Sequence, residues 1–310
     1  MARVNLNPTP NPNCQKKCNK EARKASTEND LCMKVISVKD GLPVRCVGQW
    51  AEQKIYLLYQ YFGIFTKGMK NKWSGKLNYI EICSGPGRCI DRDSGTEIDG
   101  TALAILQHEG FTHVRKALFF DFNKTVVDVL SERIAQLKIS NALAFVADYN
   151  KADELCAIIT KEIQRDSLNL VFIDPTDCSV PFTLIRKIKE TLPNVDFIIN
   201  VATGTDFNRN VPMAIGNADR ASKYCSFLNN DTFFSDPETV ALQQRGDFNN
   251  LRLKFRTTYQ NSLAAIGCKY FDIEVIQHYY DILFAAEHET AMKFWNSATA
   301  IKHDGQRTLF

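Results

Sequence analysis

The strongest constraint on the fold of this chain is a series of five apolar segments that each lead into a polar residue or turn. They occupy residues 77–82, 117–121, 142–148, 168–174 and 195–200. Strands that alternate with helices in this way form a parallel sheet with right-handed crossovers, and its ligand lies outside the carboxyl ends of the strands. Asp and Asn also end strands because they favour turns. That alternative explains one such residue well and the whole series poorly.

The first segment runs into a glycine turn, and residues 77–88 read LNYIEICSGPGR. Gly85 and Gly87 let the backbone turn tightly and approach a ligand closely, and Glu81 places a carboxylate beside the turn. The third glycine of a Gly-x-Gly-x-x-Gly dinucleotide fingerprint is missing, because residue 90 is Ile. The next helix is expected only from residue 101, after a polar loop at 89–100. Both features argue against NAD.

The remaining periodicity predicts helices between the strands and a hairpin near the end of the chain. Helices are expected at 49–65, 101–108, 124–138, 150–165, 181–191 and 247–266. Residues 270–277 and 279–286 are so close in sequence that only a hairpin joins them, which adds an antiparallel strand. We therefore predict an α/β protein with a Rossmann-like class I methyltransferase sheet over residues 49–310. An N-terminal extension at 1–48 precedes it, and an insertion at 203–246 follows the fifth strand and is expected to contact substrate or partner.

Composition and charge are those of an ordinary globular protein. The 310 residues are 45% hydrophobic and 24% charged, and the net charge of +3 is too small to indicate nucleic acid by itself. No apolar run approaches the ~18 residues of a membrane span, and the N-terminus has no apolar signal core. We expect a cytoplasmic protein whose ten cysteines are reduced thiols.

The N-terminal extension contains a candidate metal site, formed by Cys14, Cys18, Cys32 and Cys46. Thiolates with Cys-x-x-x-Cys spacing and two further cysteines suit zinc or an iron–sulfur cluster. The paired Cys-x-x-Cys knuckles of zinc ribbons are absent, so reduced thiols without metal are the favoured interpretation.

Several segments together resemble the three-Cys-motif partner protein family over about residues 49–300. They are residues 80–88, Gly100 to Leu103, 171–175, 197–200 with Arg209, and 281–288. The resemblance implies an S-adenosylmethionine-dependent methyltransferase-like protein and a partner protein that carries its own cysteine cluster. The sequence departs from the family after Asp174 and Pro175, where Thr176 and Asp177 replace an aromatic residue and glycine. A role for that loop is therefore open.

An S-adenosylmethionine site assigns a role to each polar strand end. The turn residues Cys83, Ser84, Gly85, Pro86 and Gly87 would line the methionine and ribose portion, with Glu81 orienting the turn or the amino group. Asp121 would accept the ribose hydroxyls and Phe122 would flank the adenine. Asp148 and Tyr149 would bind the amino group and face of the adenine, and Asp174 would lie beside the transferable methyl group.

Methyl transfer from a sulfonium requires alignment of the acceptor and, for a weakly acidic acceptor, a proton acceptor. Asp174 and Asp177 are the candidate acids, and Asn200 is an orienting amide. An amino-methylating DNA enzyme would show a polar residue, two prolines and an aromatic, of which the chain has only the first two positions. Nucleic acid and a partner-presented substrate both stay open as acceptors. The alternatives are a non-catalytic binding module with this fold and, less favoured, a nicotinamide oxidoreductase.

Overall fold

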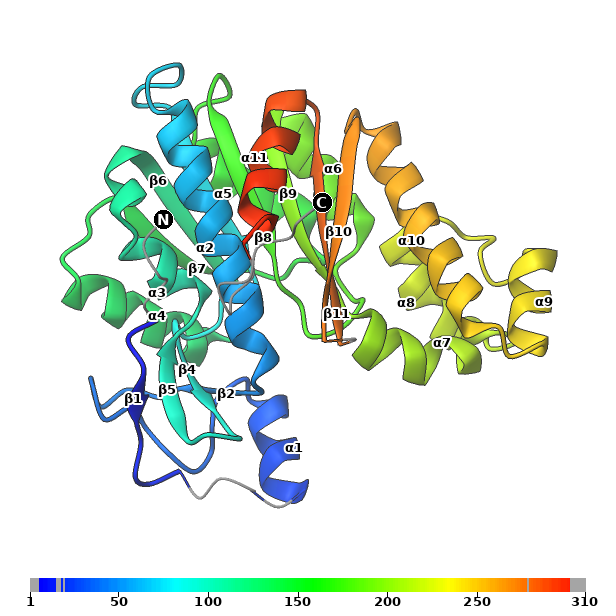
Figure 1. The fold of residues 1–310 in the computed structure, drawn as a ribbon, viewed down its shortest axis with the longest axis horizontal. Coiled ribbons are helices and arrows are strands. Elements are labelled where there is room, and N and C mark those ends of the chain that lie inside the picture. Colours follow the sequence, from blue (N-terminus) through cyan, green and yellow to red (C-terminus); the bar gives the residue numbers. More distant parts are fainter. Residues whose placement is uncertain (1–5, 15–17, 19, 278, 302–310) are drawn as a thin grey trace. The chain divides into compact units, whose positions relative to one another are not determined.

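The computed structural model describes residues 6–14, 18, 20–277 and 279–301, in two compact units. The first unit comprises residues 1–147 and 294–310, and the second comprises residues 148–293. Figure 1 labels the helices and strands of the chain.

The first unit contains the central parallel strands β3 (Leu77–Ile82), β6 (Val114–Asp121) and β7 (Ala142–Val146). β3 pairs in parallel with β6, and β6 with β7. Every residue of β3 is buried, which is why its sequence is a nearly continuous apolar run. Three helices and a 3₁₀ turn accompany the strands: α2 (Trp50–Met69), α3 (Thr101–Leu106), η1 (Glu109–His113) and α4 (Lys124–Gln136).

Helix α2 follows the predicted apolar periodicity. Ile55, Leu58, Phe62 and Phe65 recur at helical spacing and are all buried. Phe62 packs edge-on against Tyr79 of β3, with ring centroids 5.8 Å apart. The helix therefore contributes to the core beside the central strand.

The segment predicted as a polar loop at 89–100 is a β-hairpin, so that prediction was wrong. Strands β4 (Arg88–Asp91) and β5 (Thr96–Asp99) pair antiparallel directly after the glycine turn. The hairpin brings the chain back to the glycine turn, where the amide of Gly100 donates to the carbonyl of Gly87 at 2.8 Å. Helix α3 thus begins beside the turn in space, although it begins later in sequence.

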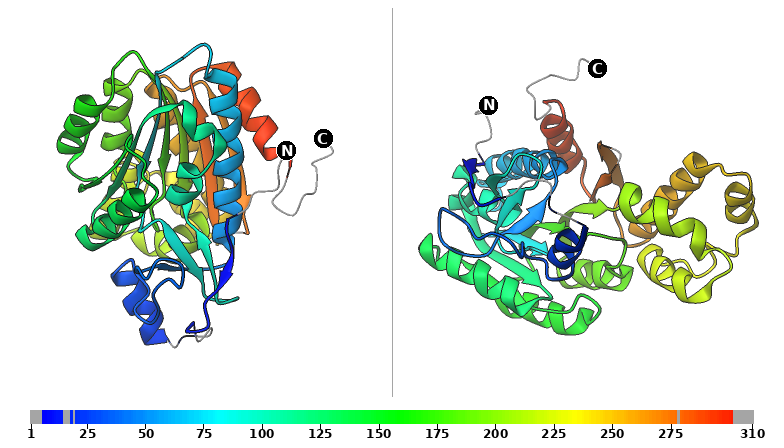
Figure 2. Two further views of the ribbon diagram at one scale, coloured as in Figure 1. Left: turned by 90° about the vertical axis from the view of Figure 1, so that its left-hand side faces the viewer. Right: turned by 90° about the horizontal axis from the view of Figure 1, so that it is seen from below.

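The N-terminal residues join this hairpin in a second sheet of four strands, ordered β1-β5-β4-β2. β1 (Thr9–Pro10) pairs antiparallel with β5, and β2 (Arg45–Val47) pairs in parallel with β4. Helix α1 (Lys20–Glu28) lies in the segment between them. Figure 2 shows this segment in blue next to the hairpin. The predicted extension thus contributes strands to an ordered sheet of the first unit.

The second unit contains strands β8 (Leu168–Ile173) and β9 (Asn194–Val201), which pair in parallel, and the hairpin β10 (Tyr270–Ile276) and β11 (Tyr280–Ala286). β11 also pairs antiparallel with β9. The helices α5 (Ala152–Glu162) and α6 (Phe182–Thr191) occupy the predicted positions. Helix α11 (Glu289–Thr299) begins in the second unit and ends in the first.

The predicted insertion after β9 is helical. It begins with a π-helical turn, η2 (Thr203–Phe207), and continues as α7 (Asn208–Ala214), α8 (Ala218–Leu228) and α9 (Pro237–Gln244), followed by α10 (Phe248–Ala265). Aromatic side chains hold α8 and α10 together. Phe227 stacks on Tyr259 with centroids 4.3 Å apart and on Phe255 at 5.8 Å. Figure 2 shows these helices as one group.

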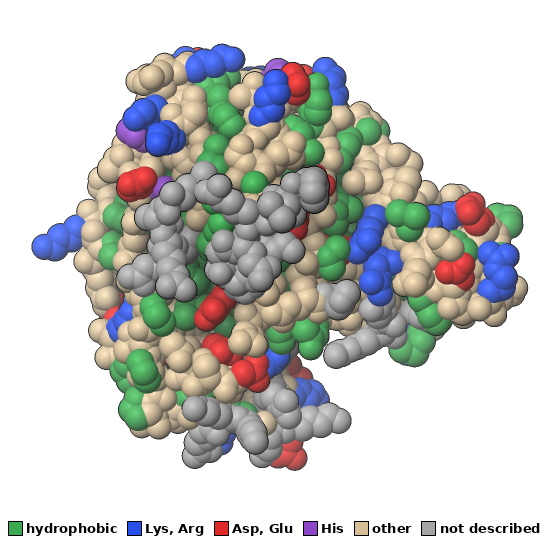
Figure 3. Space-filling model, in the orientation of Figure 1, with side chains coloured by type: hydrophobic (Ala, Val, Ile, Leu, Met, Phe, Trp, Pro, Cys, Tyr) green, Lys and Arg blue, Asp and Glu red, His purple; other side chains and the backbone are tan. Residues whose placement is uncertain are grey.

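The seven main strands are ordered β10-β11-β9-β8-β3-β6-β7. Strand β11 pairs antiparallel with both of its neighbours, whereas β9 with β8, β3 with β6 and β6 with β7 pair in parallel. A largely parallel sheet that ends in an antiparallel hairpin is the class I methyltransferase arrangement, as predicted. Charged side chains of both signs lie on the face shown in Figure 3. Among the described helices, none is both long enough and apolar enough to cross a membrane.

Candidate functional site

The turn after β3 is built from alternating left-handed residues. Cys83, Gly85 and Gly87 have φ angles of 64°, 64° and 89°. Glycine adopts this conformation without a steric cost, whereas a residue with a Cβ is strained in it. Cys83 is therefore the one strained position of the three, and such strain tends to occur at functional sites.

Gly87 is also required for packing. A Cβ on this residue would lie 2.9 Å from Cδ1 of Leu130 in α4 and 3.2 Å from Cγ of Leu103 in α3. The backbone of the turn therefore approaches both helices more closely than any side chain would permit. The close approach fixes the turn between the two helices.

Asp121, the predicted ribose acceptor, holds the turn to the end of β6. Its carboxylate accepts the amide of Gly85 at 3.0 Å and the amide of Asn123 at 3.1 Å. The side chain is almost buried, whereas the next residue, Phe122, is 69% exposed. The structure thus brings Asp121 and the turn together and places an exposed aromatic next to Asp121 in the chain, while the ribose role of Asp121 stays a prediction.

Glu81 is fully buried and points into the core. Its carboxylate accepts hydrogen bonds from the Tyr79 hydroxyl at 2.7 Å and from the hydroxyl of Thr101, the first residue of α3. Of the two predicted roles, orienting the turn suits this position. Contact with the amino group of a cofactor stays a prediction.

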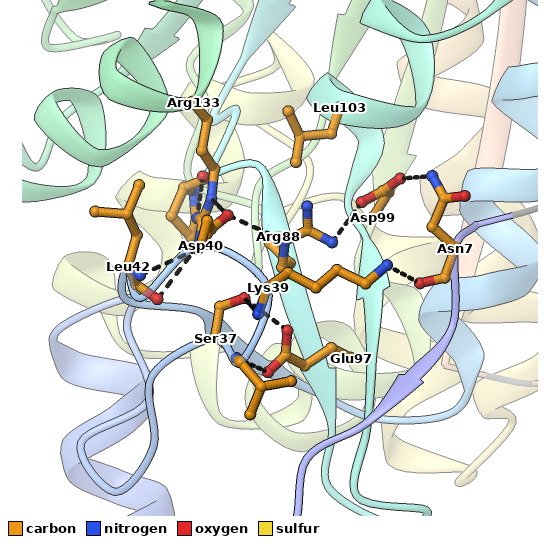
Figure 4. A network of polar contacts seen from close by, with 12 residues as sticks. Asn7, Ser37, Lys39, Asp40, Leu42, Arg88, Glu97, Asp99, Leu103 and Arg133 are labelled. Atoms are coloured by element: carbon orange, nitrogen blue, oxygen red, sulfur yellow. Dashed lines mark hydrogen bonds and ion pairs between the residues drawn. The ribbon is translucent and has the colours of Figure 1, made fainter. Parts of the chain in front are cut away.

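A buried guanidinium, that of Arg133 in α4, secures the other side of the turn (Figure 4). Arg133 is 2% exposed, donates to the carbonyl of Pro86 at 2.6 Å, and forms a two-pronged ion pair with Asp40 at 2.9 and 3.0 Å. Arg88 lies 3.3 Å from the same carboxylate. The N-terminal segment that carries Asp40 is thereby tied to the turn.

The pKa of Asp40 reflects these contacts. Burial by itself would raise it, but the hydrogen bond and charge of Arg133, the amide of Leu42 and the charge of Arg88 outweigh burial and lower the pKa to about 2. The carboxylate is therefore ionised at neutral pH.

Two acids of β5 complete the network (Figure 4). Buried Glu97 accepts hydrogen bonds from the hydroxyl of Ser37 at 2.7 Å and the amide of Asn11 at 2.6 Å. Asp99 accepts one from Arg88 at 2.8 Å and another from Asn7 at 2.5 Å. None of these contacts was predicted, because each joins residues from separate elements and no local sequence pattern indicates them.

The four N-terminal cysteines are not joined in disulfides. The hydrogen bond from Cys46 is the largest influence on Cys32 and lowers the pKa of that thiol to about 6, while the same contact raises the pKa of Cys46. Among the described residues, no three or more His, Cys, Asp or Glu side chains are grouped as a metal site requires. The structure therefore gives the predicted centre of Cys14, Cys18, Cys32 and Cys46 no support.

The predicted adenine residues lie at the start of the second unit. Asp148 accepts the backbone and side-chain amides of Asn150, both at 2.9 Å. The Tyr149 hydroxyl lies 2.9 Å from that of Ser179. Both side chains are half-buried. Their contact with adenine stays a prediction.

Asp174, the candidate acid, and Asn200, the candidate orienting amide, lie together in the second unit. The amide nitrogen of Asn200 donates to Asp174 at 2.8 Å and to the carbonyl of Pro175 at 3.1 Å. The Asn200 side-chain oxygen is buried and has no hydrogen-bond partner among the described residues. A buried amide oxygen of this kind is an acceptor that a ligand can satisfy.

Asp177 belongs to a different cluster. Lys223 of α8 contacts it at 3.1 Å and contacts Asp206 of the π-helical turn at 2.7 Å. Asp206 also accepts the Tyr224 hydroxyl and the amide of Cys178, each at 2.9 Å. Burial alone would raise the pKa of Asp206, but Lys223, Cys178 and Asn210 lower it. The cluster fastens the loop after β8 to the insertion, and the side chain of Arg209 lies outside the description.

Two hollows of about 420 and 550 Å³ lie in the second unit. The larger is lined by Thr183 and Ser222, among others, and the smaller by Lys189 and Glu287. No predicted site residue lines either hollow.

No protein-family model matches the sequence, and the comparison with curated proteins gives no match. Among solved structures, the chain is similar to a putative S-adenosylmethionine-dependent methyltransferase from Methanococcus maripaludis, with 13% identity, coverage of 78% of this chain and 96% of that one, and a TM-score of 0.36. It is also similar to an S-adenosylmethionine-dependent methyltransferase from Aquifex aeolicus, with 11% identity, coverage of 72% and 89%, and a TM-score of 0.38.

A third similar structure is an O-methyltransferase family 2 protein from Planctomyces limnophilus in complex with apigenin, with 11% identity, coverage of 68% and 50%, and a TM-score of 0.35. All three identities are below 25% and all three TM-scores are below 0.5. The fold assignment therefore rests on the strand order, and these likenesses carry no conclusion about the acceptor.

The Asp40–Arg133 contact predicts a large, pH-dependent loss of stability in Asp40→Asn. Breaking a buried pair leaves a guanidinium without its carboxylate, and we expect about 3 kcal/mol less unfolding free energy at pH 7 in urea titrations. Asp128→Asn, which breaks the exposed Lys124–Asp128 pair, is the control and should change it by less than about 1 kcal/mol.

The Asp40–Arg133 contact also predicts how the unfolding free energy changes at acid pH. Because the folded pKa of Asp40 lies below the ordinary value of 3.8, its contribution is complete above about pH 4 and is lost as the pH falls toward about 2. The difference between wild type and Asp40→Asn should shrink over that range. A difference that stays constant down to pH 2 would contradict the ion-pair assignment.

The strained turn predicts an inverted order of stability at Cys83. Cys83→Gly should be more stable than Cys83→Ala by about 1 kcal/mol, because only glycine relieves the left-handed conformation. At Cys89, in strand β4, the order should be the usual one, with Ala above Gly. Thermal unfolding of the four variants measures both orders, and an Ala variant that is the more stable at Cys83 would show that the turn is not strained there.

Proposed function

We propose that this protein is an S-adenosylmethionine-dependent methyltransferase and that the turn from Cys83 to Gly87 is part of its donor site. The observation that carries the proposal is the turn itself, at the carboxyl end of β3 in a sheet of class I order. In open α/β sheets, this end of the strands is where ligands bind.

The side chains around the turn fit an adenosyl ligand. The hydroxyl of Ser84 is buried and has no hydrogen-bond partner among the described residues, so it can serve a polar ligand group. Asp121 already accepts two amides, and a carboxylate has about four acceptor positions, which leaves capacity for a ribose hydroxyl. The exposed ring of Phe122 offers a stacking face for adenine.

When bound, S-adenosylmethionine would supply an activated methyl group on its sulfonium sulfur. Transfer of that methyl group leaves a neutral thioether. The task of the protein is then to align the acceptor and, where needed, take its proton. In the second unit, Asp174 is our candidate for the proton and Asn200 for orientation, since they are hydrogen-bonded to each other. Asp177 is a weaker candidate than the sequence indicates, because Lys223 engages it.

The methyl acceptor and any partner belong to the same proposal. The resemblance to the three-Cys-motif partner family supports a substrate presented by a partner protein, and nucleic acid is the other acceptor class. A non-catalytic module with this fold would bind the cofactor or nothing and transfer no methyl group.

Calorimetry tests the donor site. Wild type should bind S-adenosylmethionine and S-adenosylhomocysteine and should not bind NAD. Phe122→Ala should weaken both by about tenfold with an unchanged melting temperature, because it removes an exposed stacking ring and no core contact. Leu253→Ala, which trims another exposed apolar side chain in α10, is the control.

No binding of either adenosyl compound by wild type would refute the methyltransferase proposal. Binding that is equally strong in wild type and Phe122→Ala would remove Phe122 from the site. Tight binding without methyl transfer to RNA, DNA or protein acceptors would favour the non-catalytic module.

A further inference from the structure

The N-terminal segment reaches the glycine turn through Arg45. This residue begins β2, which pairs in parallel with β4, so that Arg45 lies opposite Cys89, two residues after Gly87. Its Nη1 atom is 3.5 Å from the position that a Cβ on Gly85 would occupy. The guanidinium therefore lies against the open side of Gly85, on the first unit's own turn.

A carboxylate of the same segment holds the guanidinium in place. Asp30 accepts a hydrogen bond from Nη2 of Arg45 at 2.9 Å, and both side chains are partly exposed. Asp30 has a left-handed backbone with φ of 55°, which a non-glycine residue adopts only when its surroundings impose it. The fold of the segment therefore holds Asp30 in position to pair with Arg45.

The segment is also attached on the Asp121 side of the turn. The side-chain amide of Asn123 donates to the carbonyl of Asn29 at 3.1 Å, and the amide of Asn123 itself donates to Asp121. Asp121 in turn accepts the amide of Gly85. The contacts thus run from Gly85 through Arg45 to Asp30, along the chain to its neighbour Asn29, and through Asn123 back to Asp121.

These contacts place one cation and two carboxylates around the turn. Burial raises the pKa of Asp30, Arg45 lowers it, and the nearby charge of Asp121 raises it further. Asp30 is therefore close to Asp121 as well as to Arg45. A zwitterionic ligand with separate anionic and cationic groups matches such an arrangement better than a neutral one.

We propose that Arg45 is a binding residue of the donor pocket and that its guanidinium recognises the α-carboxylate of the amino-acid portion of the cofactor, with Asp30 as the positioning residue. This rests on the proposed function. A guanidinium presents its donors in a planar fork that matches a carboxylate, and such charge-assisted bonds are strong and directional. Arg45 lies at Gly85, in the part of the turn assigned to the methionine and ribose portion.

A ligand truncation separates this role from a structural one. S-adenosylhomocysteine carries the amino acid, whereas 5′-methylthioadenosine keeps the adenosine and the sulfur and lacks the carboxylate. Calorimetry with the full chain should show that Arg45→Ala weakens binding of S-adenosylhomocysteine by about tenfold to a hundredfold and binding of 5′-methylthioadenosine by less than about threefold.

Two further variants keep the test valid if Arg45→Ala unfolds. Arg45→Lys retains the charge and loses the fork, and it should show the same selectivity with a smaller loss. Asp30→Asn should show it too, because the guanidinium loses its charged partner. Arg92→Ala is the matched control, from the turn between β4 and β5. Arg92 lies over the Trp50 ring at 4.8 Å, and its loss should leave both affinities unchanged.

The outcomes are distinct. Equal losses for both ligands in the Arg45 variants, or no loss for either, would overturn the role of Arg45 while wild-type binding upheld the donor site. Failure of wild type to bind either ligand would overturn the proposed function and this inference together.

Discussion

The structure around the glycine turn depends on one buried guanidinium. Arg133 connects the carbonyl of Pro86, inside the turn, with the carboxylate of Asp40, in the N-terminal segment. Desolvation of a guanidinium is costly, and the cost is recovered only when the charge is paired and its donors are used. The charge of Arg133 is paired with Asp40, and its donors are used by Asp40 and by the carbonyl of Pro86 in the turn. The turn, the segment and α4 are therefore stabilised together.

This coupling explains why the N-terminal residues are ordered. Their sequence contains prolines and polar residues, and its buried apolar residues Val35 and Val44 cluster with Ile90 of the hairpin. They gain order by satisfying the buried acids of the hairpin, Glu97 and Asp99, and by pairing β1 and β2 with it. A segment that looks like an extension in sequence thereby contacts the residues of the candidate site.

The sequence predicted those elements whose signal is local. Buried runs predicted β3 and β6, helical spacing predicted α2, and the short separation of two apolar runs predicted the hairpin of β10 and β11. The hairpin of β4 and β5 was missed because its acids read as a polar loop. Their partners lie far away in sequence: Glu97 and Ser37 are 60 positions apart, and Asp99 and Asn7 are 92 apart.

In the candidate site, too, only the features with a local signal were predicted. Gly85 and Gly87 predicted the turn, and the position of Asp121 at a strand end predicted that it would lie beside the turn. The left-handed backbone of Cys83 and the reach of Arg45 to Gly85 have no local signature, since both follow from how distant strands pair. The attachment of Asp177 to Lys223 likewise needed the insertion to be folded.

The most direct test of the account is a crystal structure of the protein with S-adenosylhomocysteine. We predict density for the ligand along Ser84 to Gly87, with its ribose at Asp121 and its adenine against Phe122. Density only in another place, such as the hollow lined by Thr183 and Ser222, would contradict the central claim that the glycine turn is the donor site.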